Sequence, residues 1–337
     1  MTAPAFLVTI DTEGDNQWAR PREITTRNVA LLPRFHELCR RHGVLPTYLT
    51  NYEMATDPAF VAFGRAVLAE SSGEIGMHLH AWNSPPLMPL TSDDLAAHPP
   101  LVAYPSAVLR AKVAFMTRLL EDTFEVAMES HRAGRWAFDG TYARALVEQG
   151  YRADCSVTPH MAWRYEGMGP GRTMVVDHRR APHEPYRVDL DDVTRPGGSP
   201  LLEVPLTVRR SDPQTLRALR DLLPAGSLAA RGMAKMVAPH RWLRPRRGNL
   251  ASLMALLDET AQSGLPHAQF IIHSSELMPG GSPYFPGPDD VEQLFDDLDA
   301  LFAHARSRYR GMTVGGFARA WQAGEARRAA PLARLEA

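Results

Sequence analysis

Short apolar runs alternate with amphipathic stretches along most of the chain. The runs have the length and the β-branched and aromatic content of buried strands, and they fall at 5–11, 45–51, 73–80, 125–134, 151–157, 199–208 and 267–275. Apolar residues recur at helical spacing over 27–43, 57–73, 106–124, 139–150, 249–264 and 288–308, and a short strand and a helix follow over 311–328. This alternation is typical of a mostly parallel sheet whose strands are joined by helical crossovers.

The number of strand–helix units favours a closed barrel over an open sheet. About seven or eight units in roughly 320 residues match a (β/α) barrel, so we predict an α/β fold: a distorted (β/α)7 TIM-like barrel forming a single domain over 1–330. Residues 160–198 are rich in Pro, Gly, Arg and His without a clear period, which predicts long loops over one rim. Residues 209–248 predict an inserted helical segment, and 331–337 a flexible C-terminal tail.

Composition and charge narrow the choice of partner. The net charge of −1 over 337 residues provides no overall field that would favour nucleic acid or an anionic membrane. The two cysteines, Cys39 and Cys155, have no spacing that indicates a disulfide framework or a structural zinc site. No apolar run approaches the roughly 18 residues that span a bilayer, and the apolar N-terminal stretch is too short for a signal peptide. We therefore expect a cytoplasmic protein that binds a small molecule or a glycan, in an oligomeric state that the sequence leaves open.

Ionisable residues follow five of the predicted strands at the point where each strand ends. In a parallel barrel these carboxyl ends lie on one face, which is the face that carries catalytic residues. Side chains at positions i and i+2 of a strand point the same way, so His78 and His80 can converge on one atom. The residues at the five ends are Asp11 with Glu13 and Asp15, His78 with His80, His131 with Arg132 and Arg135, Asp154, and His273 with Glu276.

These residue types indicate a metal-dependent hydrolase. A carboxylate and two histidines from neighbouring strands form a facial N,N,O ligand set for a divalent ion, with open positions for water and substrate. Such an ion activates water and polarises a carbonyl group. A second carboxylate nearby can act as base, and a histidine on a distant strand as acid toward a leaving amine. The pattern therefore predicts hydrolysis of an amide or an ester.

Five segments together resemble the polysaccharide deacetylase family, the NodB-homology group of metal-dependent carbohydrate deacetylases. The resemblance covers most of residues 5–275, and the segments occur in the family's order. They are VTIDTEGD, GEIGMHLH, HRAGRW, GYRADCSVTP and FIIHSSE. The resemblance implies a distorted barrel of about seven strands. It also implies removal of an acetyl group from a sugar.

The resemblance assigns catalytic roles to four residues. Asp11 matches the catalytic base, and His273 matches the catalytic acid. Arg132 matches the arginine that holds the base. Asp154 would pair with Arg132 or with His273.

The expected metal ligands depart from the family pattern. His78 matches the family's first metal histidine, but the second lies two residues later, at His80, instead of four. The family's aspartate ligand falls on Thr12, so Glu13 is the expected carboxylate and Asp15 the alternative. These D-T-E and H-L-H-x-W signatures resemble a branch found with bacterial surface-sugar and secondary-metabolite genes. The implied cofactor is a divalent metal, Zn²⁺ being our choice.

Three further residues are candidates for substrate binding. Trp82 and Trp136 could stack on a sugar face, and Arg135 could bind a phosphate or carboxylate with its planar fork. The predicted reaction is removal of the N-acetyl group from an amino sugar, an intermediate of surface-polysaccharide or secondary-metabolite synthesis, with release of acetate. Two alternatives remain open: a metal-free or differently metallated amidohydrolase that opens a ureide or cyclic amide, and a sugar-binding barrel without catalysis.

Overall fold

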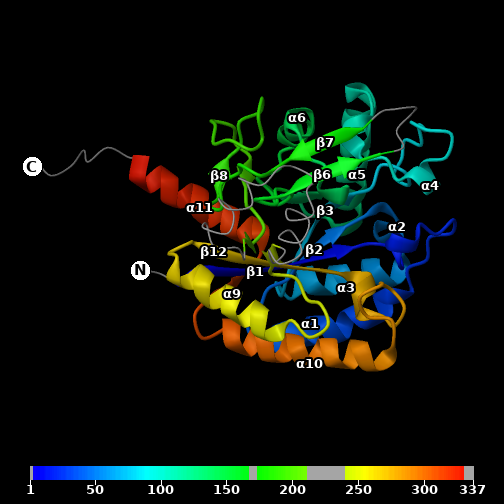
Figure 1. The fold of residues 1–337 in the computed structure, drawn as a ribbon. Helices are drawn as coiled ribbons and strands as arrows, with labels where there is room; N and C mark the ends of the chain where they lie inside the picture. The colour runs from blue at the N-terminus through cyan, green and yellow to red at the C-terminus, as the bar shows by residue number, and fades with distance from the viewer. Residues whose placement is uncertain (1–2, 167–172, 211–239, 330–337) are drawn as a thin grey trace, which may run out of the picture.

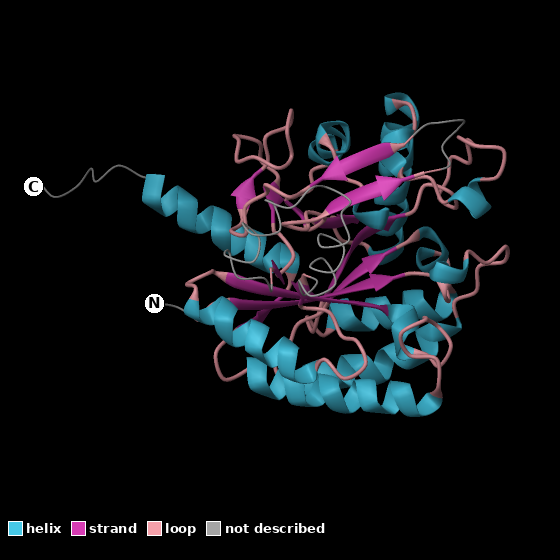
Figure 2. Ribbon diagram, viewed as in Figure 1, coloured by secondary structure: helices cyan, strands magenta, loops and turns pink. Residues whose placement is uncertain are grey.

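The computed structural model describes residues 3–166, 173–210 and 240–329 (Figure 1). Strands form the interior of the molecule and helices pack around them (Figure 2). Most of the predicted inserted segment, over 211–239, and the predicted tail, 331–337, lie outside the described residues. No helix within the described part of the chain has the length and apolar character that crossing a membrane requires.

The main sheet has nine strands and is parallel except at one edge. Its strands run in the order β12-β1-β2-β3-β4-β5-β9-β8, with β13 paired to the start of β1, and the pair β8–β9 is antiparallel. Two further pairs, β6–β7 and β10–β11, form separate two-stranded sheets. The bounds are β1 Ala5–Thr12, β2 Thr47–Thr50, β3 Glu74–Leu79, β4 Ser130–Ala133, β5 Ala153–Asp154, β6 Ala162–Tyr165, β7 Met174–Asp177, β8 Tyr186–Arg187, β9 Leu202–Glu203, β10 Val208–Arg209, β11 Arg241–Trp242, β12 His267–His273 and β13 Arg310–Met312.

Single backbone hydrogen bonds close the curled sheet into a distorted barrel. Beyond β5, the N–H of Leu206 donates to the carbonyl of Val157 (3.0 Å). The N–H of Leu243 then donates to Thr207 (3.0 Å), and that of Ile271 in β12 donates to Leu243 (3.1 Å). The β10–β11 segment thus bridges the gap between β5 and β12. The predicted barrel architecture is confirmed, with a closure that is much looser than a full ladder.

Helices cover the outside of this barrel. Helices α1, α3, α9 and α10 lie along one side of the sheet, and α5 and α6 lie on another (Figure 1). At the start of α3, Asp57 accepts hydrogen bonds from the N–H groups of Ala59 and Phe60, and Pro58 is the first helical residue. The bounds are α1 Leu32–Arg41, α2 Tyr52–Ala55, α3 Pro58–Ala69, α4 Asp94–Ala97, α5 Ser106–Phe124, α6 Gly140–Glu148, α9 Leu250–Gln262, α10 Pro288–Ala305 and α11 Val314–Ala329.

The two-residue period of the strands directs the polar side chains into the barrel. All eight residues of β1 are buried, and Phe6, Val8 and Ile10 belong to the large apolar core that contacts the helices. The residues between them face the other way, so Asp11 points inward. In β3 the same rule sends Met77 and Leu79 to the helix side and His78 to the interior.

The rim segment 160–198 is more ordered than the sequence predicts. In place of long loops, it contains the antiparallel pair β6–β7 and the edge strand β8. The side chains of β6 and β7 are largely exposed or half-buried. This pair therefore lacks the apolar alternation by which strands are recognised.

Candidate functional site

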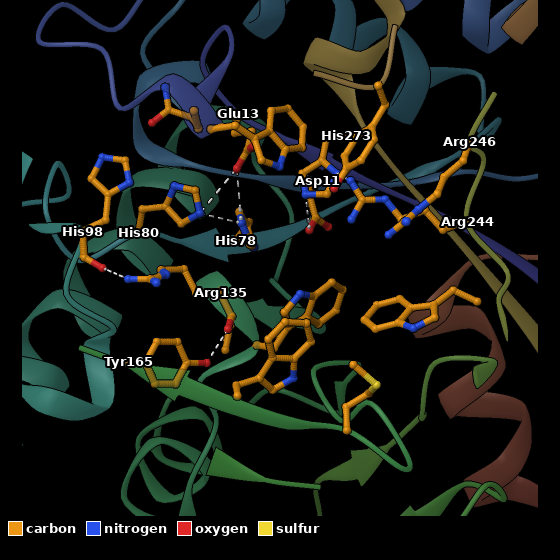
Figure 3. Close-up of a pocket in the computed structure, with 18 of the residues that line it drawn as sticks. Asp11, Glu13, His78, His80, His98, Arg135, Tyr165, Arg244, Arg246 and His273 are labelled. Carbon is orange, nitrogen blue, oxygen red and sulfur yellow. Dashed lines mark hydrogen bonds and ion pairs between the residues drawn. The ribbon is translucent and has the colours of Figure 1, made fainter. Parts of the chain in front are cut away.

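Three side chains at the carboxyl ends of β1 and β3 meet at one point. Oε2 of Glu13 lies 3.3 Å from Nε2 of His80 and 3.7 Å from Nε2 of His78. The two Nε2 atoms are 3.0 Å apart (Figure 3). All three residues are buried, and one ligand atom from each lies within 4.8 Å of the others. The structure thus brings together the carboxylate and the two histidines that the sequence suggests as metal ligands.

The surroundings fix both imidazoles. Nδ1 of His78 donates to the carbonyl of Arg132 (2.9 Å), which directs Nε2 toward Glu13. The ring of His80 stacks on the indole of Trp82 at a centroid distance of 4.2 Å. The other face of Trp82 stacks on His98 at 4.0 Å. The two histidine nitrogens are therefore held in place by a carbonyl on one side and an aromatic stack on the other.

This cluster fits a divalent metal ion. Two ligand atoms bound to one tetrahedral Zn²⁺ ion lie roughly 3.4 Å apart, close to the separations seen here. The Glu13 carboxylate has no arginine or lysine within ion-pair distance among the described residues. The alternative ligand, Asp15, lies outside the cluster because its oxygens accept hydrogen bonds from Thr25 and from the backbone and side chain of Asn28.

A buried ion pair stands beside the cluster. Nη1 of Arg132 donates to Oδ1 of Asp11 (2.5 Å), and Nη2 donates to the hydroxyl of Thr9 (2.8 Å). Burial alone would raise the pKa of Asp11, but the Arg132 guanidinium, with contributions from His78 and His273, holds it below its usual range. Asp11 is therefore a carboxylate, not a carboxylic acid, throughout the neutral pH range. Arg132 lies beside Asp11, where the resemblance places it.

His273 faces Asp11 from the end of β12. Its Nε2 lies 3.7 Å from Oδ2 of Asp11, and its Nδ1 lies 3.2 Å from Oε2 of Glu276. Arg244 donates to the other oxygen of Glu276 (3.0 Å). Burial opposes ionisation of Glu276, but the charge of Arg244 and the contacts with His273 lower its pKa to about 2. Glu276 and Arg244 thus orient His273, a role that the sequence-based assignment does not include. The position of Glu276 three residues after His273 is the sequence feature that points to it.

Asp154 does not pair as predicted. Its carboxylate accepts hydrogen bonds from Nδ1 of His131 (2.6 Å) and from the hydroxyl of Ser156 (2.8 Å), not from Arg132 or His273. The expected partners are wrong because Asp154 and His131 are paired in register on neighbouring strands. Asp154 affects the site indirectly, because its negative charge helps to keep the pKa of Arg132 high despite burial.

A pocket of about 1060 Å³ opens over these groups. It is lined by Asp11, Glu13, His78, His80 and His273 and by a set of aromatic residues. Trp136, Trp163 and Trp242 form one wall, with ring centroids 5.8 to 6.1 Å apart. Trp18 lies over His273 at a centroid distance of 5.0 Å. Trp18 and Trp163 come from loop and rim segments that have no motif, and sequence analysis misses them.

All three predicted substrate contacts line this pocket, and both tryptophans among them are buried. Arg135 is half-buried beside Tyr165, and Trp136 belongs to the aromatic wall. The prediction for Trp82 does not fit the structure, because His80 and His98 cover both faces of its indole and leave none for a sugar. Its role is to support His80.

Comparisons with known proteins agree on the fold. No family model matches the sequence, and no curated protein matches it. A solved protein from Mycobacterium smegmatis assigned as a polysaccharide deacetylase superposes with a TM-score of 0.51 and 14% identity, over 100% of this chain and 96% of that one. One from Parabacteroides distasonis assigned as a glycoside hydrolase or deacetylase superposes with a TM-score of 0.58 and 10% identity, over 95% and 72%.

The chain has the fold of these deacetylase-type proteins. At such low identity the similarity establishes the fold alone, and that fold is the distorted barrel that the sequence motifs predict.

Proposed function

We propose that this chain is a metal-dependent hydrolase of the polysaccharide deacetylase family, which removes the N-acetyl group of an amino sugar and releases acetate. One observation carries the proposal. Within one pocket, a buried N,N,O group lies beside a carboxylate held anionic by arginine, and an imidazole faces that carboxylate. This set supplies the base, the acid and the ligands that amide hydrolysis requires.

Glu13, His78 and His80 would hold the ion, for which we propose Zn²⁺. When bound, the ion supplies Lewis-acid polarisation of the amide carbonyl and of the attacking water. The hydrogen bond from His78 to the Arg132 carbonyl keeps Nε2 free as a donor to the ion. For His80, the stacking contact with Trp82 restricts the orientation of the ring.

Asp11 is the proposed base. Oδ1 is engaged by Arg132, so Oδ2 is the oxygen that accepts the proton of the attacking water. The same arginine stabilises the carboxylate before the reaction and prevents its rotation. Asp154 is not proposed to touch the substrate, and it contributes by sustaining the charge of Arg132.

His273 is the proposed acid. With Nδ1 directed at Glu276, Nε2 faces the pocket on the side of Asp11 and can donate a proton to the leaving amine. Glu276 orients the imidazole through its contact with Nδ1, and Arg244 fixes Glu276 through a hydrogen bond to Oε1. In the aromatic wall, the half-buried Trp163 and Trp242 offer apolar ring faces of the kind on which a sugar stacks, and the buried Trp136 supports them.

Acetate release from a panel of N-acetyl sugars and their conjugates, with and without added zinc, tests this proposal. We expect zinc-dependent release by the wild type. Asp11→Asn and His273→Ala should each lose at least about 100-fold in kcat, since general acid–base catalysis contributes that much, while circular dichroism shows a retained fold. Activity of either variant at the wild-type level would remove that residue from the mechanism. Activity that survives complete chelation would favour the metal-free amidohydrolase instead.

A further inference from the structure

The pocket carries more positive than negative charge. Its acidic lining residues are Asp11, which is paired with Arg132, and Glu13, which faces the histidine pair. Six arginines line the same pocket: Arg20, Arg135, Arg164, Arg241, Arg244 and Arg246. Arg164, Arg241 and Arg244 each face a glutamate, at 3.7, 2.6 and 3.0 Å. Within the described residues, Arg20, Arg135 and Arg246 have no carboxylate at ion-pair distance.

Arg135 is the one of these three that is withdrawn from solvent. Arg20 and Arg246 are exposed, whereas Arg135 is half-buried at the end of β4. Its Nη1 donates to the carbonyl of His98, and its guanidinium carbon lies 4.9 Å from the centre of the Tyr165 ring. Figure 3 shows it on the His80 side of the pocket, close to the proposed ligands. Burial lowers the pKa of this cation, so its position costs free energy that no carboxylate of the described protein returns.

The backbone holds Arg135 in this position against its own preference. Arg135 and Trp136 both have positive φ values, 58° and 63°, a conformation that is unfavourable for residues with long side chains. The hydroxyl of Tyr165 donates to the carbonyl of Arg135 (2.5 Å) and fixes the strained turn. Strain of this kind persists where the surrounding structure enforces it, and it is concentrated at ligand-binding sites.

We propose that Arg135 binds an oxyanion of the substrate, a carboxylate or a phosphate, and that the preferred substrate is an acidic N-acetyl amino sugar. The planar guanidinium matches either group with two parallel hydrogen bonds. One donor nitrogen is engaged by the His98 carbonyl, and the remaining donors are available to the ligand. This inference rests on the proposed function for the identity of the acetyl sugar, and it adds the charge that the sugar must carry.

The test compares three sugars with the same N-acetyl group: N-acetylglucosamine, its uronic acid and its 1-phosphate. Binding to the zinc-loaded protein is measured by calorimetry, separately from acetate release. Arg135→Gln keeps a long side chain with a Cβ and leaves the bond from Tyr165 to the backbone intact. Arg65→Gln is the matched control, because Arg65 also donates to a backbone carbonyl, that of Thr123, and lies outside the pocket.

We expect the wild type to bind one of the acidic sugars at least about 10-fold more tightly than the neutral sugar, and Arg135→Gln to reduce this preference about 10- to 100-fold, as loss of a charged hydrogen bond does. Arg65→Gln should leave the preference unchanged. Preference for the uronic acid identifies a carboxylate, and preference for the 1-phosphate identifies a phosphate.

The inference is wrong if the wild type does not bind either acidic sugar, or binds neither more tightly than the neutral sugar. It is also wrong if Arg135→Gln weakens the binding of all three sugars equally. A loss of preference in Arg65→Gln as large as that in Arg135→Gln would overturn it as well. A retained, Arg135-dependent preference without acetate release would instead refute the proposed function and leave the anion site standing.

Discussion

Two carboxylates two residues apart, Glu13 and Asp15, have opposite surroundings. Asp15 accepts hydrogen bonds from Thr25, Arg27 and Asn28, so its oxygens are already satisfied. The Glu13 oxygen faces two imidazole nitrogens. The donors around each group, which come from segments distant in the chain, decide which one is available to a metal ion. Sequence analysis reaches both candidates and prefers Glu13, but the hydrogen bonds of Asp15 are visible only in the folded chain.

Removal of the carboxylate of Glu276 tests the group formed by His273, Glu276 and Arg244. Glu276→Gln leaves Arg244 buried without a counter-ion, and we expect the free energy of unfolding at neutral pH to fall by about 3–5 kcal/mol. Because the folded pKa of Glu276 is about 2, below its ordinary value of 4.5, its stabilisation is full above about pH 4.5 and is lost as the pH falls toward 2.

Chemical denaturation from pH 7 to pH 2 measures both effects. The Glu276→Gln variant should lose less stability than the wild type between about pH 4.5 and pH 2. Glu292→Gln, which removes an exposed partner of Arg34, should behave like the wild type throughout. Parallel acid profiles of the wild type and Glu276→Gln would show that Glu276 is not the group that titrates.

At the scale of elements, the site depends on the close approach of two neighbouring strands. Strand β3 ends at Leu79, directly before His80. The chain that follows β4 contains Gly134, which packs against the imidazole of His80. A Cβ on Gly134 would stand 2.5 Å from Cδ2 of His80 and 2.5 Å from the carbonyl of Leu79. Glycine at this position therefore lets the imidazole reach the cluster.

Gly134→Ala should displace His80 and weaken zinc binding about 10- to 100-fold, the range seen when a group that orients a ligand is changed. Gly198→Ala is the control, because a Cβ at Gly198 meets no atom within 4 Å. Competition with a chromophoric chelator measures both affinities. If Gly134→Ala binds zinc as tightly as Gly198→Ala, the close packing does not position the ligand.

The elements that sequence analysis finds are those with long apolar runs. The apolar runs of strands β1, β3 and β12 stop at Asp11, His78 and His273, so the positions of these residues can be read from where each run ends. The β6–β7 pair is half-exposed and gives no such signal. The stacking of His98 on Trp82 joins a loop to a strand end, and no local pattern encodes it.

For the whole molecule, one large apolar core connects most of the described helices to the main sheet. Its buried members run from Phe6 in β1 to Tyr309 before β13. Closure of the barrel also joins distant segments, as Ile271 donates to Leu243 across the β10–β11 ribbon. That residues 1–330 form a single domain stays a prediction, and its direct test is the cooperativity of unfolding.

A single domain of this kind should unfold in one step. In differential scanning calorimetry we expect one transition whose calorimetric and van't Hoff enthalpies agree, because the largest buried cluster is contiguous from Phe6 to Tyr309. Zinc should raise the transition temperature, since a ligand of the folded state stabilises it by about 2.7 kcal/mol at 100 times its Kd. Two resolved transitions would show that the chain has separate domains.

The proposed hydrolysis depends on Glu13, His78 and His80 holding one metal ion. Zinc content after loading and exhaustive dialysis, measured by inductively coupled plasma mass spectrometry, tests this most directly. We predict about one zinc per chain in the wild type, a large loss in Glu13→Gln and in His78→Ala, and full retention in His304→Ala, whose imidazole pairs with Asp258 on the surface. A wild type without bound zinc, or a His78→Ala variant with as much zinc as the wild type, would contradict a metal site at these three residues.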